Sequence, residues 1–399
     1  MMDKIDEVLE RGVEEILPGR EGLVALMKKN KIRLYLGIDP TGGRLHLGHT
    51  ISLRKIQQFA DLGHEAILVI GTGTVLAGDP SARNEGRTPV TEKEIKKNIS
   101  SWRKQAGKIL DLGKVKIKYN GDWLLKLNLK DILKIASQIS AIQLFKRDMF
   151  QRRIENGDTV WLHETLYPLL QGYDSVVLDV DLEVGGKDQT FNMLIGRELQ
   201  RKMSNREKYV LTTEMILGTD GQPMSKTSEN CVWLTDSPGE MFGKIMSIPD
   251  EQIIPYFTLL TDVTEEEITE MEELLKGHSE NPMVLKKKLA REIVTMYHSD
   301  KEAQEAEEEF EKVVQKKELP TEIKVVNLSK TFISGATITD VVVETELANS
   351  RSEAKRLISQ GGTTIAGEII TDPNAPFTGE SGTVIRVGKR KFVKINIVD

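Results

Sequence analysis

The sequence predicts an α/β protein whose first part is built on a parallel sheet, followed by an α-helical domain and a small α+β domain. Up to about residue 213, short apolar runs that suit buried strands alternate with helical patterns, as in repeated βαβ units. Beyond about residue 235, helix-capping signals follow one another without strand patterns. Short strand patterns return only in the last 65 or so residues.

Size and composition exclude several classes of protein. The 399 residues suffice for two or three domains, and 39% hydrophobic with 29% charged residues is typical of a soluble globular protein. No apolar run reaches the roughly 18 residues of a membrane span, and residues 1–4 do not resemble a signal peptide. A single cysteine, Cys231, fits a reducing cytosol, so we expect a cytoplasmic protein. A net charge of −6 argues against blanket binding of nucleic acid but leaves room for a local basic patch.

The first strand-to-helix turn carries a phosphate-binding pattern. An apolar strand is predicted at 34–38, a glycine-containing loop at 39–43, and a helix from Leu47. Such a turn presents unpaired N–H groups and the positive end of the helix dipole to an anion. His46 and His49 share one face of the first helical turn, and Gly48 between them leaves room for a flat ring such as adenine. A chance turn in which both histidines have ordinary hydrogen-bond partners fits the same pattern. A zinc site is a weaker interpretation, because no third ligand lies at a usable spacing.

Further elements follow in order. We expect helices over residues 1–32, strands at 66–70, 115–119, 181–184 and 210–213, a capped helix from Thr91, and an amphipathic helical insertion at about 131–156. Tyr167, Gln171 and Asp174 then fall on one face of a helix in an apolar segment, which favours a pocket wall over a solvated face. Gly185, Gly186 and Asp188 form a second glycine-rich turn, suited to a ribose hydroxyl or simply to a backbone bend.

The polar loop 221–228 contains one lysine, Lys226, among serines and threonines. In most proteins such a lysine is solvated, but in a nucleotide enzyme it is a candidate clamp on transferring phosphates. Capping signals at Ser237, Thr264 and Ser299 predict an all-helical unit to about residue 317. In the tail, a capped helix at 350–362 and four short strands surround a basic cluster: Arg351, Lys355, Arg356, Lys389, Arg390 and Lys391. The cluster suits an RNA backbone, although an ordinary small α+β domain explains it equally well.

Taken together, these segments resemble the class I aminoacyl-tRNA synthetases, and within them the bacterial tyrosyl-tRNA synthetases, along nearly the full chain. His46-Leu47-Gly48-His49 is similar to the first class signature and Met224-Ser225-Lys226-Thr227 to the core of the second. The residues 78–81, 167–174 and 185–189 match tyrosyl-enzyme motifs in the family's order, and the tail resembles an S4-type RNA-binding domain. The resemblance implies a Rossmann-type catalytic domain at 1–234 with an insertion at about 92–160, a helical anticodon-binding domain at 235–320, and an S4-like domain at 335–399.

The same resemblance implies a tyrosine–tRNA ligase and assigns roles to its residues. Tyr35 and Asp174 would hydrogen-bond the tyrosine phenol, while the substrate's charged groups would be held by other residues: Asp79, Tyr167 and Gln171 for the ammonium group and Gln189 near the carboxylate. A buried Asp at the phenol explains rejection of phenylalanine, which would leave it unpaired. Tyrosine enzymes of this family are known to discriminate by about 10⁵ without editing, and no inserted editing domain is recognisable here.

On the ATP side, the implied roles follow the two signatures. His46, His49 and Thr41 would stabilise the α-phosphate transition state, and Lys226 would hold the departing pyrophosphate. Thr227 is a further catalytic position, and the remaining ATP-binding positions are Asp39, Gly48, Gly185, Gly186, Asp188, Met224 and Ser225. Mg²⁺ is expected to travel with ATP rather than to occupy a protein cage, so no metal ligands are predicted.

The chain departs from the family pattern in its second signature. Pro223 stands where the family has a first lysine, so one cation that would bind pyrophosphate is missing and Lys226 is expected to contribute more of this binding. Thr227 replaces the final serine but keeps the hydroxyl. The implied partners are tRNA(Tyr), L-tyrosine, ATP and a second copy of the chain. Alternatives are a tryptophanyl-type relative or a nucleotidylyltransferase, against which Asp174 and the tail argue. A non-catalytic RNA-binding protein is a third, and the intact histidine pair and Lys226 argue against it.

Overall fold

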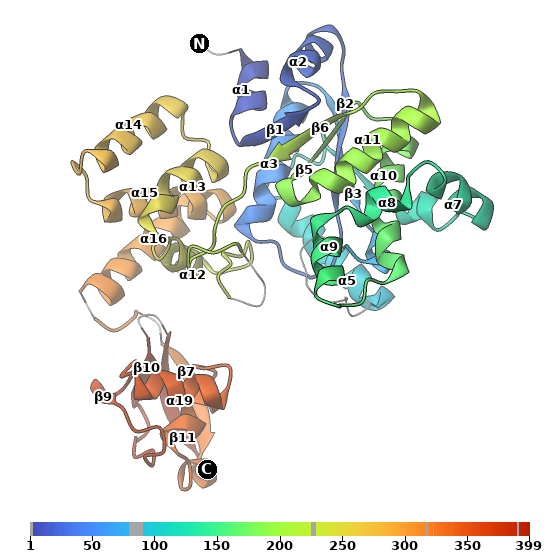
Figure 1. The fold of residues 1–399 in the computed structure, drawn as a ribbon. Coiled ribbons are helices and arrows are strands. Elements are labelled where there is room, and N and C mark those ends of the chain that lie inside the picture. The colour runs from blue at the N-terminus through green and yellow to red at the C-terminus, as the bar shows by residue number, and fades with distance from the viewer. Residues whose placement is uncertain (1–2, 80–90, 225–228, 317, 322, 389–390) are drawn as a thin grey trace. The chain divides into compact units, whose positions relative to one another are not determined.

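A computed structural model of the chain describes residues 3–79, 91–224, 229–316, 318–321, 323–388 and 391–399. It divides into two compact units (Figure 1). Unit 1 contains residues 1–236 and 244–297, and unit 2 contains residues 237–243 and 298–399. The three-domain division expected from the sequence stays a prediction.

A six-stranded sheet forms the centre of unit 1, in the order β1-β6-β5-β2-β3-β4. Every neighbouring pair is parallel except β1 and β6. Chain order runs outward from β2 through β3 and β4 on one side and through β5 and β6 on the other, so the predicted Rossmann-type α/β class is confirmed. The strands are β1 (Val13–Leu17), β2 (Arg33–Ile38), β3 (Glu65–Ile70), β4 (Lys116–Tyr119), β5 (Leu182–Gly186) and β6 (Tyr209–Thr213).

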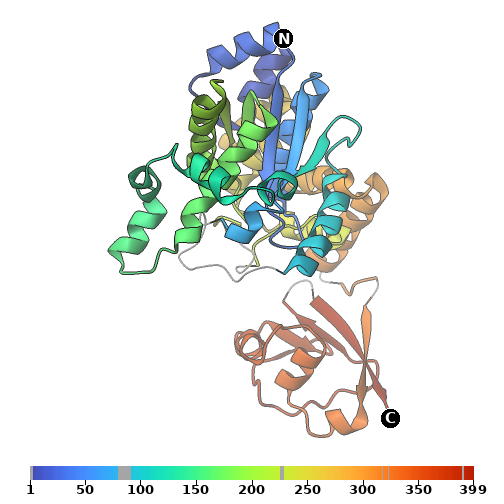
Figure 2. The same ribbon diagram turned by 90° about the vertical axis from the view of Figure 1, so that its right-hand side faces the viewer.

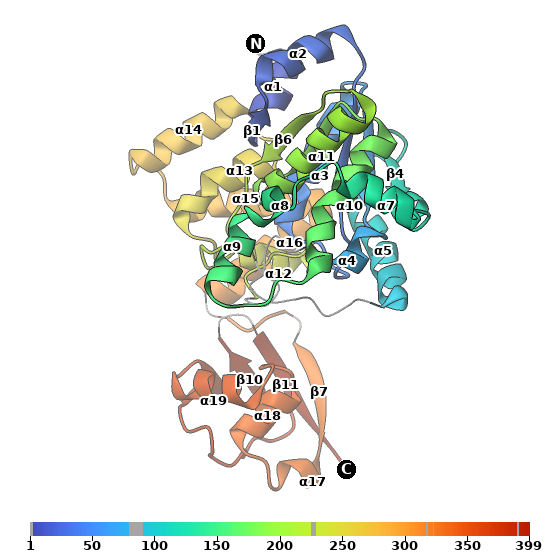
Figure 3. The ribbon, with the colours of Figure 1, turned by 45° about the vertical axis from the view of Figure 1, so that its right-hand side comes forward.

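Helices cover both faces of this sheet (Figure 2). Helix α3 packs against β2 and β3, whereas α11 packs against β5 and β6 and lies beside α10 (Figure 3). The helices are α1 (Lys4–Glu10), α2 (Arg20–Lys29), α3 (Leu47–Asp61), α4 (Thr74–Ala77), α5 (Glu92–Ala106), α6 (Gly121–Leu124), α10 (Leu162–Leu178), α11 (Thr190–Ser204), α13 (Ile253–Leu260), α14 (Glu265–Lys276) and α15 (Pro282–Tyr297), with one-turn 3₁₀ helices at Lys187–Gln189 and Asp250–Gln252.

One prediction for the N-terminal segment is wrong. Residues 1–32 were expected to be helical throughout, but Val13–Leu17 is the edge strand β1, antiparallel to β6. Gly12 before it has a φ of +67°, which ends α1, and Pro18 after it cannot continue a helix. Because this short segment fits either period, pairing with β6 decides its structure.

The stretch at 131–156 is helical, as predicted, but it forms three short helices. These are α7 (Leu129–Ala136), α8 (Ala141–Phe145) and α9 (Asp148–Glu155). Ile135, Ile139 and Leu144 form a small core with Leu169 on α10 and Leu199 on α11. The strand β4 lies inside the expected insertion at 92–160, so only the part after β4 is an addition to the sheet.

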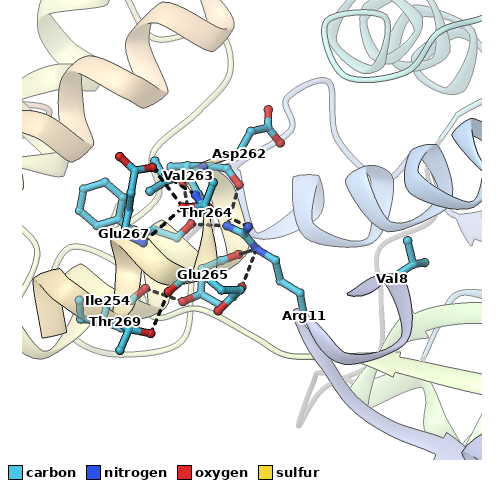
Figure 4. A network of polar contacts seen from close by, with 12 residues as sticks. Val8, Arg11, Ile254, Asp262, Val263, Thr264, Glu265, Glu267 and Thr269 are labelled. Carbon is cyan, nitrogen blue, oxygen red and sulfur yellow. Dashed lines mark hydrogen bonds and ion pairs between the residues drawn. The ribbon is translucent and has the colours of Figure 1, made fainter. Parts of the chain in front are cut away.

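Arg11 ties the N-terminal segment to the helices after residue 250 (Figure 4). Its guanidinium donates to the carbonyl oxygens of Thr258 at 2.8 Å and Val263 at 2.7 Å, and it lies 3.2 Å from Glu265. Lys55 on α3 donates to the carbonyl oxygen of Arg11 at 2.7 Å, and burial lowers its pKa to about 7. These bonds join α3 to the turn between α13 and α14.

The N-caps predicted for the helices are confirmed. Thr91 and Glu94 form a capping box at α5, and Thr264 and Glu267 form another at α14. A serine hydroxyl accepts from the backbone N–H three residues later at Ser237, Ser299 and Ser350, before α12 (Pro238–Ile245), α16 (Asp300–Phe310) and α19 (Arg351–Ser359). The predicted all-helical segment continues through α16 into a π-helical turn at Glu311–Gln315.

Unit 2 contains a second sheet, in the order β7-β11-β10-β8-β9. Its core includes Val341, Val342, Ile358, Ile385 and Ile395. The four predicted strands are present, but the tail was expected to begin at 335 and therefore omitted β7, which pairs in parallel with β11. The elements are β7 (Lys324–Ser329), α17 (Lys330–Ile333), α18 (Ile338–Glu344), α19, β8 (Thr363–Ile365), β9 (Glu368–Ile370), β10 (Val384–Val387) and β11 (Lys391–Val398).

Candidate active site

The carboxyl ends of four parallel strands bring the predicted polar residues to one edge of the sheet. Asp39 follows β2, Thr74 follows β3, Asn120 follows β4, and Asp188 and Gln189 follow β5. In open α/β sheets, ligands bind at this edge, where the strand order reverses on either side of the first strand. The reversal here lies between β2 and β5.

His46 and His49 lie together at the N-terminus of α3, as the spacing predicts. His46 is the N-cap, its backbone N–H donates to His49 Nδ1 at 3.2 Å, and the ring centroids are 3.8 Å apart. Thr41, in the loop before them, donates its backbone N–H to the carbonyl oxygen of Asp39 at 2.8 Å. Two imidazoles therefore sit at the positive end of a helix, where negative charge is favoured.

The loop before the histidines is fastened by side chains of α5, which the sequence did not reveal. Asn98 donates to the carbonyl oxygen of Pro40 at 2.9 Å, and Trp102 Nε1 donates to that of Gly42 at 2.5 Å. Gln105 Oε1 accepts from the backbone N–H of Leu45 at 2.8 Å. The backbone that positions His46 thus has fixed partners on a helix that starts some 50 residues later.

The segments flanking the second signature lie against the first signature. The backbone N–H of Leu47 donates to the carbonyl oxygen of Val232 at 3.0 Å, and His46 forms a β-bridge with Trp233. A Cβ on Gly48 would lie 3.0 Å from His46 Nδ1 and 3.6 Å from Met224 Sδ. Ser225, Lys226 and Thr227 lie outside the described residues, so their predicted roles stay predictions.

Tyr167, Gln171 and Asp174 are all buried on α10, which favours the predicted pocket wall over a solvated face. Asp174 Oδ1 accepts from Trp123 Nε1 at 2.8 Å, and Oδ2 accepts from Asn120 Nδ2 at 3.0 Å. Burial raises the pKa of Asp174 to about 8, although these two hydrogen bonds act in the opposite direction. The structure therefore places a carboxyl group in a dry, hydrogen-bonded position.

A continuous chain of hydrogen bonds joins Tyr167 to Asp174. The Tyr167 hydroxyl donates to Asp39 Oδ2 at 3.0 Å, and Thr74 Oγ1 donates to Asp39 Oδ1 at 2.6 Å. Asn120 Nδ2 lies 3.0 Å from Thr74 Oγ1 and closes the chain to Asp174. Residues that follow three different strands are thereby held in one network.

Tyr35, expected beside Asp174, lies in the middle of β2 and is fully buried. Its hydroxyl lies 3.0 Å from Ser175 Oγ, the neighbour of Asp174 on α10. Burial raises the pKa of Tyr35, and the nearby Glu183 and Asp174 carboxylates raise it further. The phenol of Tyr35 is thus neutral, so its hydroxyl can both donate and accept hydrogen bonds next to the part of α10 that carries Asp174.

A second polar group gathers around Gln189. Its Nε2 donates to Asp79 Oδ2 at 2.8 Å and to Asp188 Oδ2 at 2.9 Å. Arg147, which the sequence did not indicate, lies 4.0 Å from Asp79 Oδ1, and burial lowers its pKa. Gly186 is the last residue of β5, and a Cβ on it would lie 2.6 Å from Asp188 Oδ1. Pro80 and Ser81, which belong to the predicted motif around Asp79, lie outside the described residues.

Comparison with known proteins agrees with this arrangement. A family model described as tRNA synthetases class I (W and Y) matches residues 27–315. The tyrosine–tRNA ligase of Thermotoga maritima is 43% identical over 391 residues, covering 98% of this chain and 96% of that protein. The tyrosine–tRNA ligase of Carboxydothermus hydrogenoformans is 42% identical over 398 residues, covering 98% and 97%. The chain belongs to the class I tRNA synthetases, in the bacterial tyrosyl branch.

Solved structures share the fold of this synthetase family member. A C-terminally truncated mitochondrial tyrosyl-tRNA synthetase of Aspergillus nidulans has a TM-score of 0.65 at 23% identity, covering 77% of this chain and 93% of that one. The Archaeoglobus fulgidus tyrosyl-tRNA synthetase, solved with L-tyrosine, has a TM-score of 0.62 at 23% identity, covering 77% and 100%. An S4 domain model matches residues 338–381, which confirms the predicted S4 domain in the tail.

The described residues contain neither a membrane-spanning helix nor a metal cluster. In the part of the chain that the structure describes, no helix is long and apolar enough to cross a bilayer. Over the same residues, no group of three or more His, Cys, Asp or Glu side chains is arranged to hold a metal ion. The single cysteine, Cys231, is buried.

The residues that sequence reasoning missed are mainly hydrogen-bond partners of predicted ones. Asn120 and Trp123 hold Asp174, and Arg147 lies near Asp79. Asn120 had a usable signal, because it directly follows a predicted strand whose carboxyl end belongs at the ligand-binding edge. Arg147 had none, since a basic residue in an amphipathic insertion looks like any solvated charge.

Proposed function

We propose that this enzyme activates L-tyrosine with ATP to tyrosyl-adenylate and pyrophosphate, and then transfers tyrosine to the 3′ end of tRNA(Tyr). The observation that carries the tyrosine assignment is the buried Asp174, held by Asn120 and Trp123 on the pocket wall formed by α10. Its burial suits a substrate that brings a hydrogen-bonding group to a position screened from water. The full-length identity to tyrosine–tRNA ligases supports the same conclusion.

The phenol of tyrosine would lie between Asp174 and Tyr35. Phenylalanine would fill the space beside both groups without offering either of them a hydrogen bond, and an unsatisfied buried hydrogen-bonding position costs about 1–3 kcal/mol. Tryptophan offers an N–H at a different position and needs a wider pocket. The arrangement therefore supports selection for the phenol hydroxyl during binding, without a later editing step.

The amino and carboxyl groups of tyrosine would lie nearer the strand ends. The Tyr167 hydroxyl donates to Asp39, so its oxygen remains an acceptor for the substrate ammonium group. Gln171 and Asp79 offer a carbonyl and a carboxylate oxygen for the same group. Gln189, whose Nε2 faces Asp79, would lie near the substrate carboxylate.

ATP would bind across the N-terminus of α3. Gly48 gives adenine access to the backbone, and Gly185 and Gly186 shape the second turn. Asp39 would face the amino-acid end of the adenylate, and Asp188 would face its ribose end. His46, His49 and Thr41 would contact the α-phosphate, while Met224, Ser225, Lys226 and Thr227 would cover the pyrophosphate. Mg²⁺ would enter bound to the phosphates of ATP as part of the substrate.

Activation is an in-line displacement at phosphorus. A carboxylate oxygen of tyrosine attacks the α-phosphorus, the bond from this phosphorus to the bridging oxygen breaks, and pyrophosphate leaves. His46 and His49 donate hydrogen bonds to the charge that develops on the α-phosphate oxygens. In the second step a terminal ribose hydroxyl of the tRNA attacks the tyrosyl carbonyl carbon, and AMP leaves.

The tRNA would contact the S4 domain and the helices before it. Arg351, Lys355 and Arg356 are exposed on α19, and Lys391 is exposed at the start of β11. Such a locally basic surface on a chain of net charge −6 suits a specific phosphate backbone rather than nucleic acid in general. Lys389 and Arg390 of the predicted cluster lie outside the described residues. For an enzyme in this role we propose a cytoplasmic location, with the other components of protein synthesis.

A homodimer is supported by exposed apolar side chains on and around α7, α8 and α9. The side chains at least half exposed are Leu125, Leu129, Leu133, Ile142, Ile154, Trp161 and Leu162. Large exposed apolar patches on a soluble protein generally mark an interface. We expect sedimentation equilibrium to give a dimer for the wild type and a monomer for Leu133→Asp with Ile142→Asp, whereas Leu274→Asp on α14 should leave the dimer intact. A monomeric wild type contradicts the homodimer.

The decisive experiment is pyrophosphate exchange into ATP with tyrosine, phenylalanine or tryptophan as the only amino acid. Exchange with tyrosine alone is expected. Comparable exchange with tryptophan contradicts the phenol pocket. An absence of exchange in a folded protein that binds tRNA would instead indicate an RNA-binding protein that kept the scaffold.

A further inference from the structure

Glu183 on β5 and Lys208 before β6 form a buried ion pair under α10. Both side chains are almost fully buried, and Lys208 Nζ donates to Glu183 Oε2 and to Ser175 Oγ, the latter at 2.8 Å. A buried ion pair is commonly no more stabilising than an apolar pair of the same volume. Stability alone therefore does not explain why this pair is present, and the residues that contact it suggest a functional explanation.

Gln171 Nε2 lies 3.1 Å from Glu183 Oε1. A carboxylate paired with an ammonium group can only accept hydrogen bonds, so Gln171 must turn its N–H₂ toward Glu183. Gln171 Oε1 then faces away from Glu183. This oxygen is buried and has no hydrogen-bond partner among the residues that the structure describes. A buried carbonyl oxygen without a partner is a suitable place for a cationic group of a ligand.

We propose that Glu183, held by Lys208, is a positioning residue that fixes the orientation of the Gln171 amide so that its carbonyl oxygen receives the amino group of tyrosine. The inference rests on the proposed function, in which Gln171 contacts that amino group. The two ends of a glutamine amide have nearly the same shape, so packing alone does not choose between them. The negative charge of Glu183 decides which end of the amide faces it.

The surroundings of the pair are shaped to admit the lysine. Gly196 on α11 faces it, and a Cβ there would lie 2.6 Å from Lys208 Nζ and 2.9 Å from Ser175 Oγ. The helix thus lacks a side chain at the point where the ammonium group crosses toward Glu183. Ser175 Oγ also lies 3.0 Å from the Tyr35 hydroxyl, so the pair contacts residues near both ends of the proposed tyrosine site.

Glu183→Gln tests the inference, because it keeps the shape and removes the charge. Lys208 would take the new amide oxygen and leave its N–H₂ toward Gln171, which must then turn over and present N–H groups to the substrate. Binding would be measured for L-tyrosine, for tyramine, which keeps the amino group, and for 3-(4-hydroxyphenyl)propionate, which lacks it. We expect tyrosine and tyramine to bind about ten- to a hundredfold more weakly, with the propionate and the KM for ATP unchanged.

Equal weakening of all three ligands would show a structural role only, and no weakening would overturn the proposal. Glu207→Gln is the matched control, since Glu207 is an exposed carboxylate on the same segment, paired with Arg197. If Glu183→Gln does not fold, Glu183→Gln with Lys208→Met removes both charges together. The new amide can then turn either end toward Gln171, so tyrosine and tyramine should still bind more weakly relative to the propionate, but by a smaller factor. Gln171→Ala separates the two hypotheses: if it does not weaken tyramine more than the propionate, the proposed role of Gln171 itself is wrong.

Discussion

Asn120 Nδ2 lies 3.0 Å from Asp174 Oδ2 and 3.0 Å from Thr74 Oγ1. Its Oδ1 accepts from the backbone N–H of Gly73 at 2.7 Å. One amide therefore fastens the carboxyl group proposed for the substrate phenol to the turn after β3. Because Thr74 in turn donates to Asp39, the two ends of the tyrosine site share a support.

Asn120→Ala should weaken tyrosine binding. It removes a hydrogen bond to the Asp174 carboxyl group and leaves the Gly73 N–H without its acceptor. Because burial keeps Asp174 largely protonated below about pH 8, the relevant cost is that of a buried polar group left unsatisfied, about 1–3 kcal/mol, and we expect kcat/KM for tyrosine to fall about five- to a hundredfold. Pyrophosphate exchange at varied tyrosine and at varied ATP measures this, and the KM for ATP should change little.

Asn128→Ala is a matched control for Asn120→Ala. Asn128 caps α7 by accepting from the backbone N–H of Asp131 and lies on the exposed side of the insertion. Its loss should leave tyrosine activation unchanged. If both variants reduce activation equally, Asn120 supports the fold in general rather than the position of Asp174.

Asp174 should make the unliganded enzyme less stable as the pH rises. Burial raises its pKa from 3.8 to about 8, so between these values the folded state keeps a proton that the unfolded state releases. The stabilising contribution is complete below about pH 4 and is lost as the pH rises to about 8, by at most about 1.4 kcal/mol per pH unit. Urea unfolding of the wild type and Asp174→Asn at about pH 5 and about pH 8 measures it.

Only the difference between the two proteins is informative in this experiment. Lys55, with a pKa lowered to about 7 by burial, contributes the opposite slope above that pH, but it is present in both proteins. The wild type should therefore lose more stability between the two pH values than Asp174→Asn does. Parallel changes in both proteins would mean that Asp174 titrates near its ordinary pKa.

Local patterns made the main segments of the proposed site predictable. Strand 34–38, the glycine loop and the His46/His49 pair lie within 16 consecutive residues, so a short stretch fixes their mutual geometry. The α10 face with Tyr167, Gln171 and Asp174 follows equally from helical spacing. The alternation of strand and helix patterns then predicted a parallel sheet, because the strands of such a sheet are buried on both faces and appear in the sequence as short apolar runs.

Contacts between distant segments could not be predicted in this way. Val13–Leu17 is a strand only because β6 offers it an edge, and Asn98 reaches Pro40 across 58 positions of sequence. Glu183 and Lys208 each look like surface charges in the sequence, and only the packing of α11 at Gly196 buries them together. Sequence reasoning named the residues of the proposed site but missed most of the groups that hold them in place.

The roles of the residues on either side of Met224, Pro223 before it and Lys226 after it, can be tested by substitution. Lys226→Ala should reduce kcat for activation far more than it changes the KM for tyrosine, because Lys226 is expected to act on the departing pyrophosphate. Pro223 is exposed, so Pro223→Lys should be tolerated and should raise kcat by restoring the family's first cation. Single-turnover adenylate formation measures both. Equal effects of Lys226→Ala on kcat and KM would argue against a transition-state role.

Gly48 should tolerate no side chain, because His46 of the same signature and Met224 of the second signature lie close to it. A Cβ there would be 3.0 Å from His46 Nδ1 and 3.1 Å from His46 Cε1, so Gly48→Ala should displace this ring and obstruct the surface offered to adenine. We expect a rise in the KM for ATP and a fall in kcat, together about tenfold or more in kcat/KM for ATP, with tyrosine binding retained. Gly239→Ala is the control, since a Cβ at Gly239 would meet nothing within 4 Å. A Gly48→Ala enzyme with wild-type kinetics for ATP would show that adenine does not approach the backbone between His46 and His49.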